Sequence, residues 1–391
     1  MTESPFGSEL RQRRERAGLS YRGLGRLAVV SAGHLADLES GRRRPTREIA
    51  EALDRTLAAN GSLSALLRTP APQDAESELE ALELARRAAA SDVTDAVLHC
   101  LEHSVDSLAM AYSTTPPAEL LPRVRRHQRF VEQLIDGRAT LSQKRRLLVA
   151  GGWLSLLRAT VHVDLQQRTA AGAHLTTAAT LAEQAEQPEI SAWCLETAAW
   201  DALVRGEFRQ AAELSQHAQA VAPAGGSAIV QATAQEGRAW ARLGDRGQTL
   251  AALDRVEQFA EHRPRPEHPE HHYQYDPGKM HAYTATTLSW VGDPAAEQVA
   301  REVLAELQAE DARPRRIATA RIDLGLALLS GDCKRPDEAA AEVGAALRSG
   351  RVVPATWWRA EEVVTAVERF GIPEGRDLRD EATAARSALG E

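Results

Sequence analysis

Histidine and acidic side chains gather in one stretch of the chain, between His262 and His281, which holds five of its twelve histidines. Imidazole and carboxylate groups are ligands that zinc takes in proteins. A structural metal site holds its ligands at fixed spacing in a rigid frame, whereas prolines interrupt this stretch repeatedly. We therefore expect a solvated connection between helices here, and no bound metal.

Motifs of catalysis are absent from the sequence, which contains neither G-x-x-x-x-G-K-[ST] nor G-x-S-x-G. Cys100, Cys194 and Cys333 lie far apart and form no C-x-x-C pair, which fits a reduced compartment. No apolar run reaches the roughly 18 residues of a membrane-spanning helix, and the N-terminus has no apolar signal region. We expect a cytoplasmic protein that is not an enzyme, needs no cofactor and contacts no membrane.

Residues 20–44 indicate a different kind of chemistry, because a short helical hairpin is followed there by three consecutive arginines. Ser20 and Ser31 are suited to cap the starts of two helices, and Gly41 is suited to end the second. A helix pair of this size beside a basic run can place one helix in a DNA groove and bind the flanking phosphates. Apolar residues recur at helical spacing in both segments: Leu24, Leu27, Ala28, Leu35 and Leu38.

The pattern L-S-x-x-x-L-x-x-L-A-x-x-S-x-x-x-L-x-x-L-E-x-G-R-R-x-P begins at Leu19 and resembles the Cro/C1-type (XRE family) helix-turn-helix domain. The resemblance covers residues 6–68. It implies that Arg14 and Glu39 form a pair that ties the first helix to the third. It implies contacts with DNA bases by Ser31, Ala32, Gly33, His34 and Asp37. Phosphate contacts are expected from Tyr21, Arg22, Arg42, Arg43 and Arg44.

Small residues make this segment depart from the family pattern. Ala32 and Gly33 are too short for the bidentate contacts with bases that Arg, Asn or Gln make. Direct readout would then rest on His34 and Asp37, or on the shape of the DNA. Glycines in the preceding helix, at positions 23 and 25, should weaken it by up to ~1 kcal/mol each relative to alanine.

Charge divides the chain into two parts. Residues 1–70 carry 12 arginines and eight acidic residues, whereas the whole chain has a net charge of −8. A basic head on an acidic body fits a part that binds DNA and a part that avoids it. We therefore expect an N-terminal domain at 1–69, a proline-containing linker at 70–77 and a second domain at 78–391.

Beyond the linker the sequence is rich in alanine and leucine, without the alternation of strands, so an all-α fold is expected throughout. Gly206, Phe208, Ala211, Ala218 and Pro223 have a spacing that resembles a tetratricopeptide (TPR) repeat. Weaker units follow, with Gly-Asp pairs at 244–245, 292–293 and 331–332. The body is thus expected to be a TPR-like superhelix with a concave groove, and residues 354–370 and 374–389 to cap it.

The order of head, linker and repeats resembles that of XRE-type regulators with a TPR-like body, including actinobacterial ones. This resemblance implies a homodimer that binds double-stranded DNA and responds to a peptide or small molecule. The alternative is a TPR scaffold for protein–protein interaction whose head serves as a tether. Candidates for the ligand groove are Tyr273, Tyr275, Asp276, Trp240 and Trp290.

Overall fold

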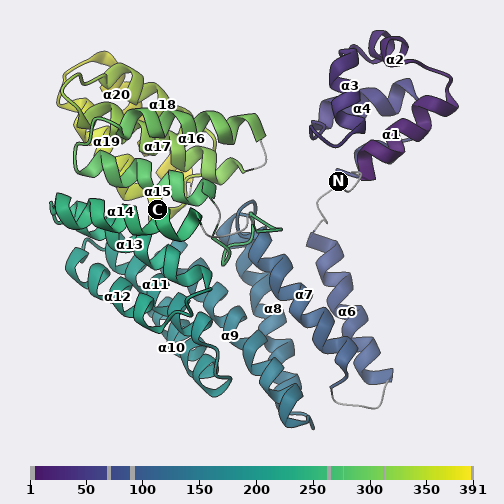
Figure 1. Cartoon of the computed structure of the whole chain (residues 1–391), viewed down its shortest axis with the longest axis horizontal. Coiled ribbons are helices and arrows are strands. Elements are labelled where there is room, and N and C mark those ends of the chain that lie inside the picture. The colour runs from purple at the N-terminus through teal and green to yellow at the C-terminus, as the bar shows by residue number, and fades with distance from the viewer. Residues whose placement is uncertain are drawn as a thin grey trace. The chain divides into compact units, whose positions relative to one another are not determined.

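The computed structural model describes residues 5–67, 72–88, 93–261, 266–275, 277–310 and 313–388. Within these ranges every regular element is a helix, as the sequence predicted (Figure 1). Contacts between residues divide the chain into two units, Met1–Glu83 and Leu84–Glu391. No helix of the described ranges is both long and apolar enough to cross a membrane.

The N-terminal unit is a group of short helices around one apolar core. Its buried side chains come from every helix of the group and include Phe6, Leu10, Leu24, Leu38 and Leu53. The helices are α1 (Pro5–Arg16), α2 (Tyr21–Ala28), α3 (Ala32–Glu39), α4 (Arg47–Thr56) and α5 (Ser62–Ala65).

Serine caps begin the two helices of the hairpin. The Ser20 hydroxyl accepts from the backbone N–H of Gly23 at 3.1 Å, and Ser31 accepts from that of His34 at 3.2 Å. A Cβ at position 25 would lie 2.4 Å from the carbonyl oxygen of Val30, in the turn between α2 and α3. Glycine at this position therefore lets the turn pass close to α2, which accounts for a residue that intrinsic helix propensity disfavours.

The expected linker lies partly within a helix. Residues 72–77 form the first turns of α6 (Pro72–Ala88), and residues 70 and 71 lie outside the described ranges. Proline at the first position of a helix costs no hydrogen bond, because the amides of the first turn have no partner within the helix. The prolines of this segment are thus compatible with a helix that starts at Pro72.

The C-terminal unit is built from antiparallel helical hairpins (Figure 1). From α9 onward each odd-numbered helix pairs with the next even-numbered one and also packs against the next odd-numbered one. Its helices are α7 (Asp95–Ala111), α8 (Pro117–Ile135), α9 (Leu141–Asp164), α10 (Arg168–Gln184), α11 (Pro188–Val204), α12 (Phe208–Val221), α13 (Ser227–Arg242), α14 (Arg246–Glu261), α15 (Pro277–Trp290), α16 (Ala296–Glu310), α17 (Pro314–Ser330), α18 (Pro336–Arg348), the 3₁₀ turn η1 (Pro354–Thr356), α19 (Trp357–Glu368) and α20 (Pro373–Ala388).

Glycines serve the hairpins in two ways. Gly206, Gly244 and Gly292 adopt positive φ angles of 79°, 77° and 64° in the turns that join paired helices. Gly237 lies where a Cβ would come 3.2 Å from Ala252 of the partner helix, which allows close packing of α13 on α14. These are the features of a TPR-like helical repeat, and the expected capping pair is present as α19 and α20.

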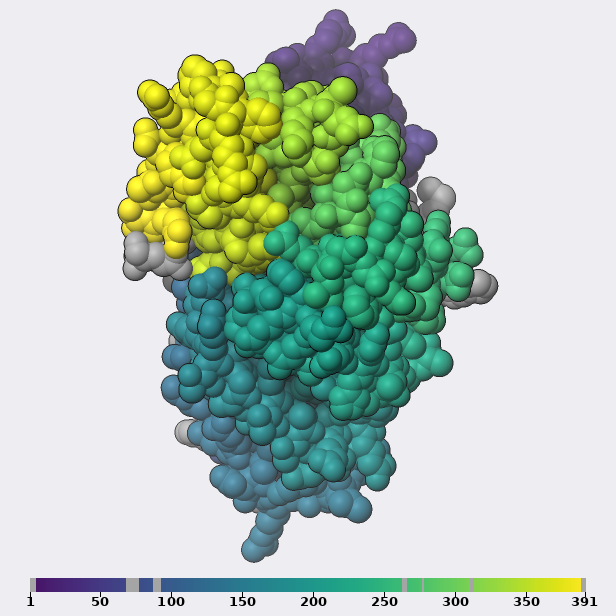
Figure 2. Space-filling model, turned by 90° about the vertical axis from the view of Figure 1, so that its left-hand side faces the viewer, coloured from purple at the N-terminus to yellow at the C-terminus, as the bar shows by residue number. Residues whose placement is uncertain are grey.

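The helical array curls back on its first helices. The side chain of Arg315 in α17 reaches Asp164 of α9 at 2.5 Å and Tyr112, at the end of α7, at 3.0 Å. The side-chain amide of Gln166 donates to the carbonyl oxygen of Pro354 at 3.1 Å. Figure 2 shows the hairpins as one continuous surface on the face that it presents. The interior therefore contains a partly open cavity, beside which the first and last hairpins of the unit are in contact.

Candidate functional site

Helix α3 presents its first turn at the surface of the N-terminal unit. Ser31 and Gly33 are exposed, Ala32 and Asp37 are half-buried, and a Cβ at Gly33 would meet no atom within 4 Å. His34 is half-buried, and its Nε2 is covered without a hydrogen-bond partner. Small side chains thus leave the backbone at the start of α3 accessible to a closely approaching partner.

The arginines that follow α3 differ in their surroundings. Arg42 forms an ion pair with Asp37 at 3.1 Å and also donates to the Ser40 hydroxyl. Arg43 and Arg44 are exposed, and neither forms an ion pair with a described residue. Arg22 is exposed on α2. Arg22, Arg43 and Arg44 thus offer positive charge to an outside partner beside α3.

A buried cluster ties α1, α2 and α3 together. Arg14 donates to Glu39 through Nε at 2.6 Å and through Nη2 at 2.9 Å, and its guanidinium lies 4.4 Å from the centre of the Tyr21 ring. Hydrogen bonding to Glu39 raises the pKa of both Arg14 and Tyr21. The Tyr21 hydroxyl donates to Glu39 at 2.8 Å. The one hydroxyl proton of Tyr21, which a contact with a phosphate oxygen would need, is thus engaged with Glu39 in the free protein.

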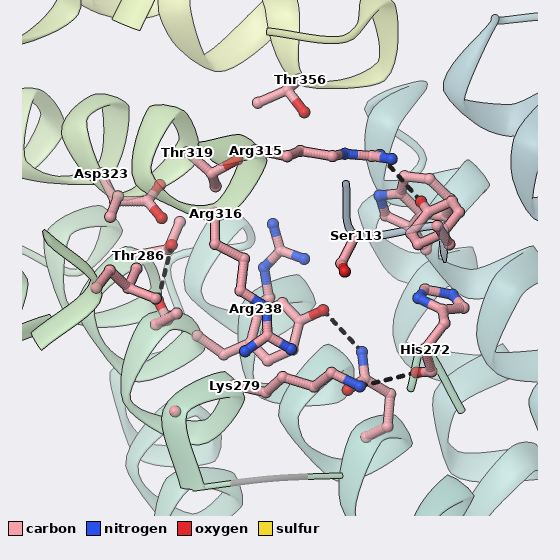
Figure 3. A pocket seen from close by; sticks show the side chains of 18 of the residues that line it. Ser113, Arg238, His272, Lys279, Thr286, Arg315, Arg316, Thr319, Asp323 and Thr356 are labelled. Atoms are coloured by element: carbon pink, nitrogen blue, oxygen red, sulfur yellow. Dashed lines mark hydrogen bonds between the residues drawn. The ribbon is translucent and has the colours of Figure 1, made fainter. Parts of the chain in front are cut away.

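The C-terminal unit encloses a cavity of about 200 Å³ (Figure 3). Most of its wall comes from α11, α13, α15, α17 and α19, the first helix of each hairpin. The end of α7 and the segment before α15 close the wall beside Tyr112 and His272. Its charged lining residues are Glu196, Arg238, Glu270, Lys279, Arg315, Arg316, Asp323 and Arg359.

Most of these cations have partners within the protein. Burial opposes the charge of Arg315, but Asp164 and Tyr112 outweigh it and raise the pKa of this side chain. Arg359 donates to Asp323 at 2.5 Å, with both side chains buried. Lys279 donates to the backbone carbonyls of His271 at 3.2 Å and His272 at 2.8 Å. These interactions hold the wall together across four elements.

Arg238 differs from Arg315 and Arg359, because it forms no ion pair with a described residue. Burial lowers its pKa to about 10, and its Nη1 donates to the side-chain oxygen of Gln235 at 3.0 Å. Figure 3 shows Arg238 in the middle of the site, together with Arg316 and Lys279. A buried guanidinium that has only neutral partners is costly for a folded protein.

Glu196 is the acidic counterpart on α11. It is 5% exposed, and burial raises its pKa to about 7, against the effects of the Gln231 hydrogen bond and of Arg238 and Lys279. The amide nitrogen of Gln231 donates to Glu196 at 3.1 Å and to the Tyr283 hydroxyl at 2.8 Å. The carboxyl group therefore exists in both protonation states near neutral pH.

The aromatic residues expected in a ligand groove lie elsewhere. Tyr273 is 4% exposed and packs against Trp153 and Trp193, with its hydroxyl 3.1 Å from that of Thr160. Tyr275 is buried beside Val230 and Val256. Large aromatic side chains are favourable core residues, and these fill gaps between helices rather than line the cavity.

The two expected tryptophans also pack between hairpins. Trp240 donates to Glu236 at 3.1 Å, and Trp290 stacks on Trp358 with ring centres 5.5 Å apart. Neither is among the residues that line the cavity. Asp276 lies outside the described residues.

The histidine-rich stretch is only partly solvated. Among its described residues, His271 and Tyr273 are buried, and His272 packs on Tyr112 with ring centres 4.1 Å apart. Burial lowers the pKa of His272 well below its usual value. The described residues contain no group of three or more His, Cys, Asp or Glu side chains arranged to hold a metal ion. The expectation of a solvated connection was therefore wrong for residues 271–275.

The cavity residues that were not predicted from the sequence recur at helical spacing. On α17, Arg315, Thr319 and Asp323 recur at intervals of four, so they share one face of the helix. On α13, Gln231 and Arg238 are seven residues apart in a helix that is otherwise rich in alanine. Polar residues repeated on the first helix of successive hairpins thus indicate the inner wall.

Comparison with known proteins finds one family match, to the model described as "Helix-turn-helix domain", over residues 5–67. The N-terminal unit therefore contains a helix-turn-helix domain. No curated protein matches the chain.

Two solved structures show a distant likeness in fold. A Bacillus thuringiensis PlcR structure "in complex with the peptide PapR7 and DNA" is 12% identical and has a TM-score of 0.27, covering 73% of this chain and 99% of that one. The apo form of the competence regulator ComR from Streptococcus vestibularis is 11% identical, with a TM-score of 0.29 and coverage of 98% of both chains. Both TM-scores are low.

Proposed function

We propose that this protein is a DNA-binding transcriptional regulator whose C-terminal unit binds an effector in its cavity. The helix-turn-helix domain at residues 5–67 is the observation that carries the first half. The accessible start of α3 and the exposed arginines beside it support the same function. Helices of this kind enter the major groove with their N-terminal residues against base edges.

The contacts that the unit offers to DNA follow from its surface. Arg22, Arg43 and Arg44 are the phosphate contacts, which fix position without reading sequence. Base readout belongs to the side chains of α3 from Ser31 to Asp37, with His34 as the largest of them. Asp37 is paired with Arg42 in the free protein, so these two side chains must exchange partners if either binds DNA.

We further propose that the protein acts as a homodimer in the cytoplasm. A single head of this size has a small interface with DNA, on the order of 600–1,000 Å² for a single module. Two heads bind two half-sites about 34–36 Å apart, one turn of the double helix. Effector control would act by favouring one arrangement of the two heads.

Binding to the DNA upstream of the protein's own coding region, measured in a salt titration with footprinting, tests the DNA-binding half. R43A/R44A should weaken binding to all sequences and make the salt slope shallower by about two units, one for each lost phosphate contact. H34A should relax specificity instead. R351A/R376A removes the same charge from exposed positions of the C-terminal unit and should change neither property.

Two protected half-sites about one turn apart, with a steep salt dependence, would support the regulator and its dimer. Weak binding that is blind to sequence and unchanged in R43A/R44A would contradict the proposal. The protein would then be better explained as a helical-repeat scaffold whose head is a tether.

A further inference from the structure

Arg238 is a buried cation in the wall of the cavity, and Glu196 and Asp323 favour its charge without forming an ion pair with it. Arg238 is 4% exposed, and no carboxylate of the described residues forms an ion pair with it. Its Nε is buried and has no hydrogen-bond partner. The guanidinium carbon lies 5.0 Å from the centre of the Tyr283 ring and 5.4 Å from that of Trp290. Cation–π contacts of this kind offset only part of the cost of burying a charge.

The neighbouring charges do not supply the missing partner. Asp164 is taken by Arg315 and Asp323 by Arg359, both through hydrogen bonds of 2.5 Å. Glu196, on the neighbouring helix, accepts from Gln231 and forms no ion pair with Arg238. Arg238 thus keeps a positive charge with which an anion from outside can form an ion pair.

We propose that Arg238 binds the anionic group, a carboxylate or a phosphate, of a small organic effector held in this cavity. The proposal rests on the effector control proposed above and specifies the chemistry of the ligand. A planar guanidinium presents paired donors that match both oxyanions. Ala282, Leu307 and Ala320 supply apolar wall for the uncharged part of the ligand.

The volume of the cavity bears on whether its ligand is a small molecule or an extended peptide. Its volume of about 200 Å³ lies below the roughly 300–1,000 Å³ of pockets for drug-sized ligands. Contacts of Arg315 and Gln166 join α17 and η1 to the first helices of the unit, so the array offers no continuous open groove there. This volume suits a small anion better than an extended peptide.

Thermal unfolding of the full-length protein, titrated with small anions, tests the proposal. Inorganic phosphate and benzoate represent the two oxyanions, and benzamide is the neutral counterpart of benzoate. At least one anion should raise the Tm of the wild type in a saturable way, whereas benzamide should not. R238M should weaken the apparent affinity at least tenfold. R209M removes an exposed arginine from α12 and should bind as the wild type does.

Three results would overturn the proposal: no saturable effect of either anion, equal effects of benzoate and benzamide, or equal affinity in R238M and the wild type. R238M without ligand should keep its helical content and a Tm no lower than that of the wild type, because it removes an unpaired buried charge. A large drop in this Tm would instead assign Arg238 a purely structural role. R238K, which retains the charge without the paired donors, should bind with intermediate affinity.

Footprinting with and without the bound anion separates this inference from the proposed function. If the anion binds through Arg238 but leaves DNA affinity unchanged, the anion site stands and effector control fails. If no anion binds while R43A/R44A still loses DNA affinity, the DNA-binding half stands and the anion site fails.

Discussion

Replacing Glu39 with leucine would remove the acceptor that joins three helices of the helix-turn-helix domain. Glu39 accepts two hydrogen bonds from Arg14 and one from the Tyr21 hydroxyl. Its side chain is 2% exposed and that of Arg14 is 10% exposed. The substitution leaves the Tyr21 hydroxyl without its acceptor, and Arg14 keeps only the Leu19 carbonyl and the exposed Glu15, so the cost includes desolvation of both groups.

The expected loss of stability in E39L is about 3–5 kcal/mol, the range for removing one partner from a buried pair. An exposed pair contributes only about 0–1 kcal/mol. E51L is the matched control, since Glu51 pairs with Arg47 on the surface of α4, where the two side chains are 49% and 87% exposed. The loss in E51L should therefore stay below about 1 kcal/mol.

Hydrogen exchange of the backbone amides of α1, α2 and α3 in the full-length protein measures this difference without interference from the C-terminal unit. About 3 kcal/mol corresponds to more than a hundredfold faster exchange through opening of the N-terminal unit. DNA binding should be lost in parallel, because α3 is no longer held against α1. The reasoning is refuted if E39L exchanges less than tenfold faster than the wild type, or no faster than E51L.

Gly25 and Gly33 of the hairpin, and the buried Glu196 of the cavity, give further tests. G25A should destabilise the N-terminal unit by about 1–3 kcal/mol, because the new methyl group would meet the Val30 carbonyl oxygen; amide exchange in α2 and α3 would show it. G33A should stabilise the same unit by up to ~1 kcal/mol, since nothing lies within 4 Å of its Cβ; a slower exchange of α3 amides would confirm this, and a faster one would contradict it. Burial raises the pKa of Glu196 from 4.5 to about 7, so the folded state holds a proton that the unfolded state has lost, and wild-type stability falls as pH rises through this window. E196Q lacks this loss and should gain up to about 3 kcal/mol relative to the wild type between pH 5 and pH 8; denaturant unfolding at both pH values measures it, and a constant difference would exclude the mechanism.

Local patterns were enough to predict the two helices of the hairpin in the N-terminal unit. Ser20 and Ser31 cap the helices that their types and positions indicated, and Leu24, Leu35 and Leu38 are buried at helical spacing. The role of Gly25 was not predictable, because it depends on how closely the Val30 carbonyl returns to α2. Helix propensity accounts only for the free-energy cost of a glycine within its own helix, and not for the close approach of a backbone atom from the following turn.

The residues that line the cavity were not predicted, because the sequence analysis selected mainly aromatic residues as ligand contacts. Tyr273 and Trp290 pack against other aromatic rings and are therefore core residues rather than ligand contacts. Arg238 would have been a better indicator of the cavity. It is a charged residue in a helix of mostly small apolar residues, and a buried arginine usually has a binding partner. That Arg238 forms no ion pair can be seen only from the three-dimensional arrangement of the surrounding helices.

The proposed anion site and the contacts that curl the array share one helix. Arg315 and Arg316 are adjacent on α17, and Arg315 reaches back to Asp164 while both line the cavity. An anion at Arg238 would add a negative charge to a cavity wall that also contains Arg315, Arg316 and Arg359, so the curled arrangement should be more stable with the ligand than without it. A ligand shifts the unit from one arrangement to another only if it stabilises one of them more than the other. Effector binding in the cavity would change the arrangement of the two heads in the proposed dimer in this way.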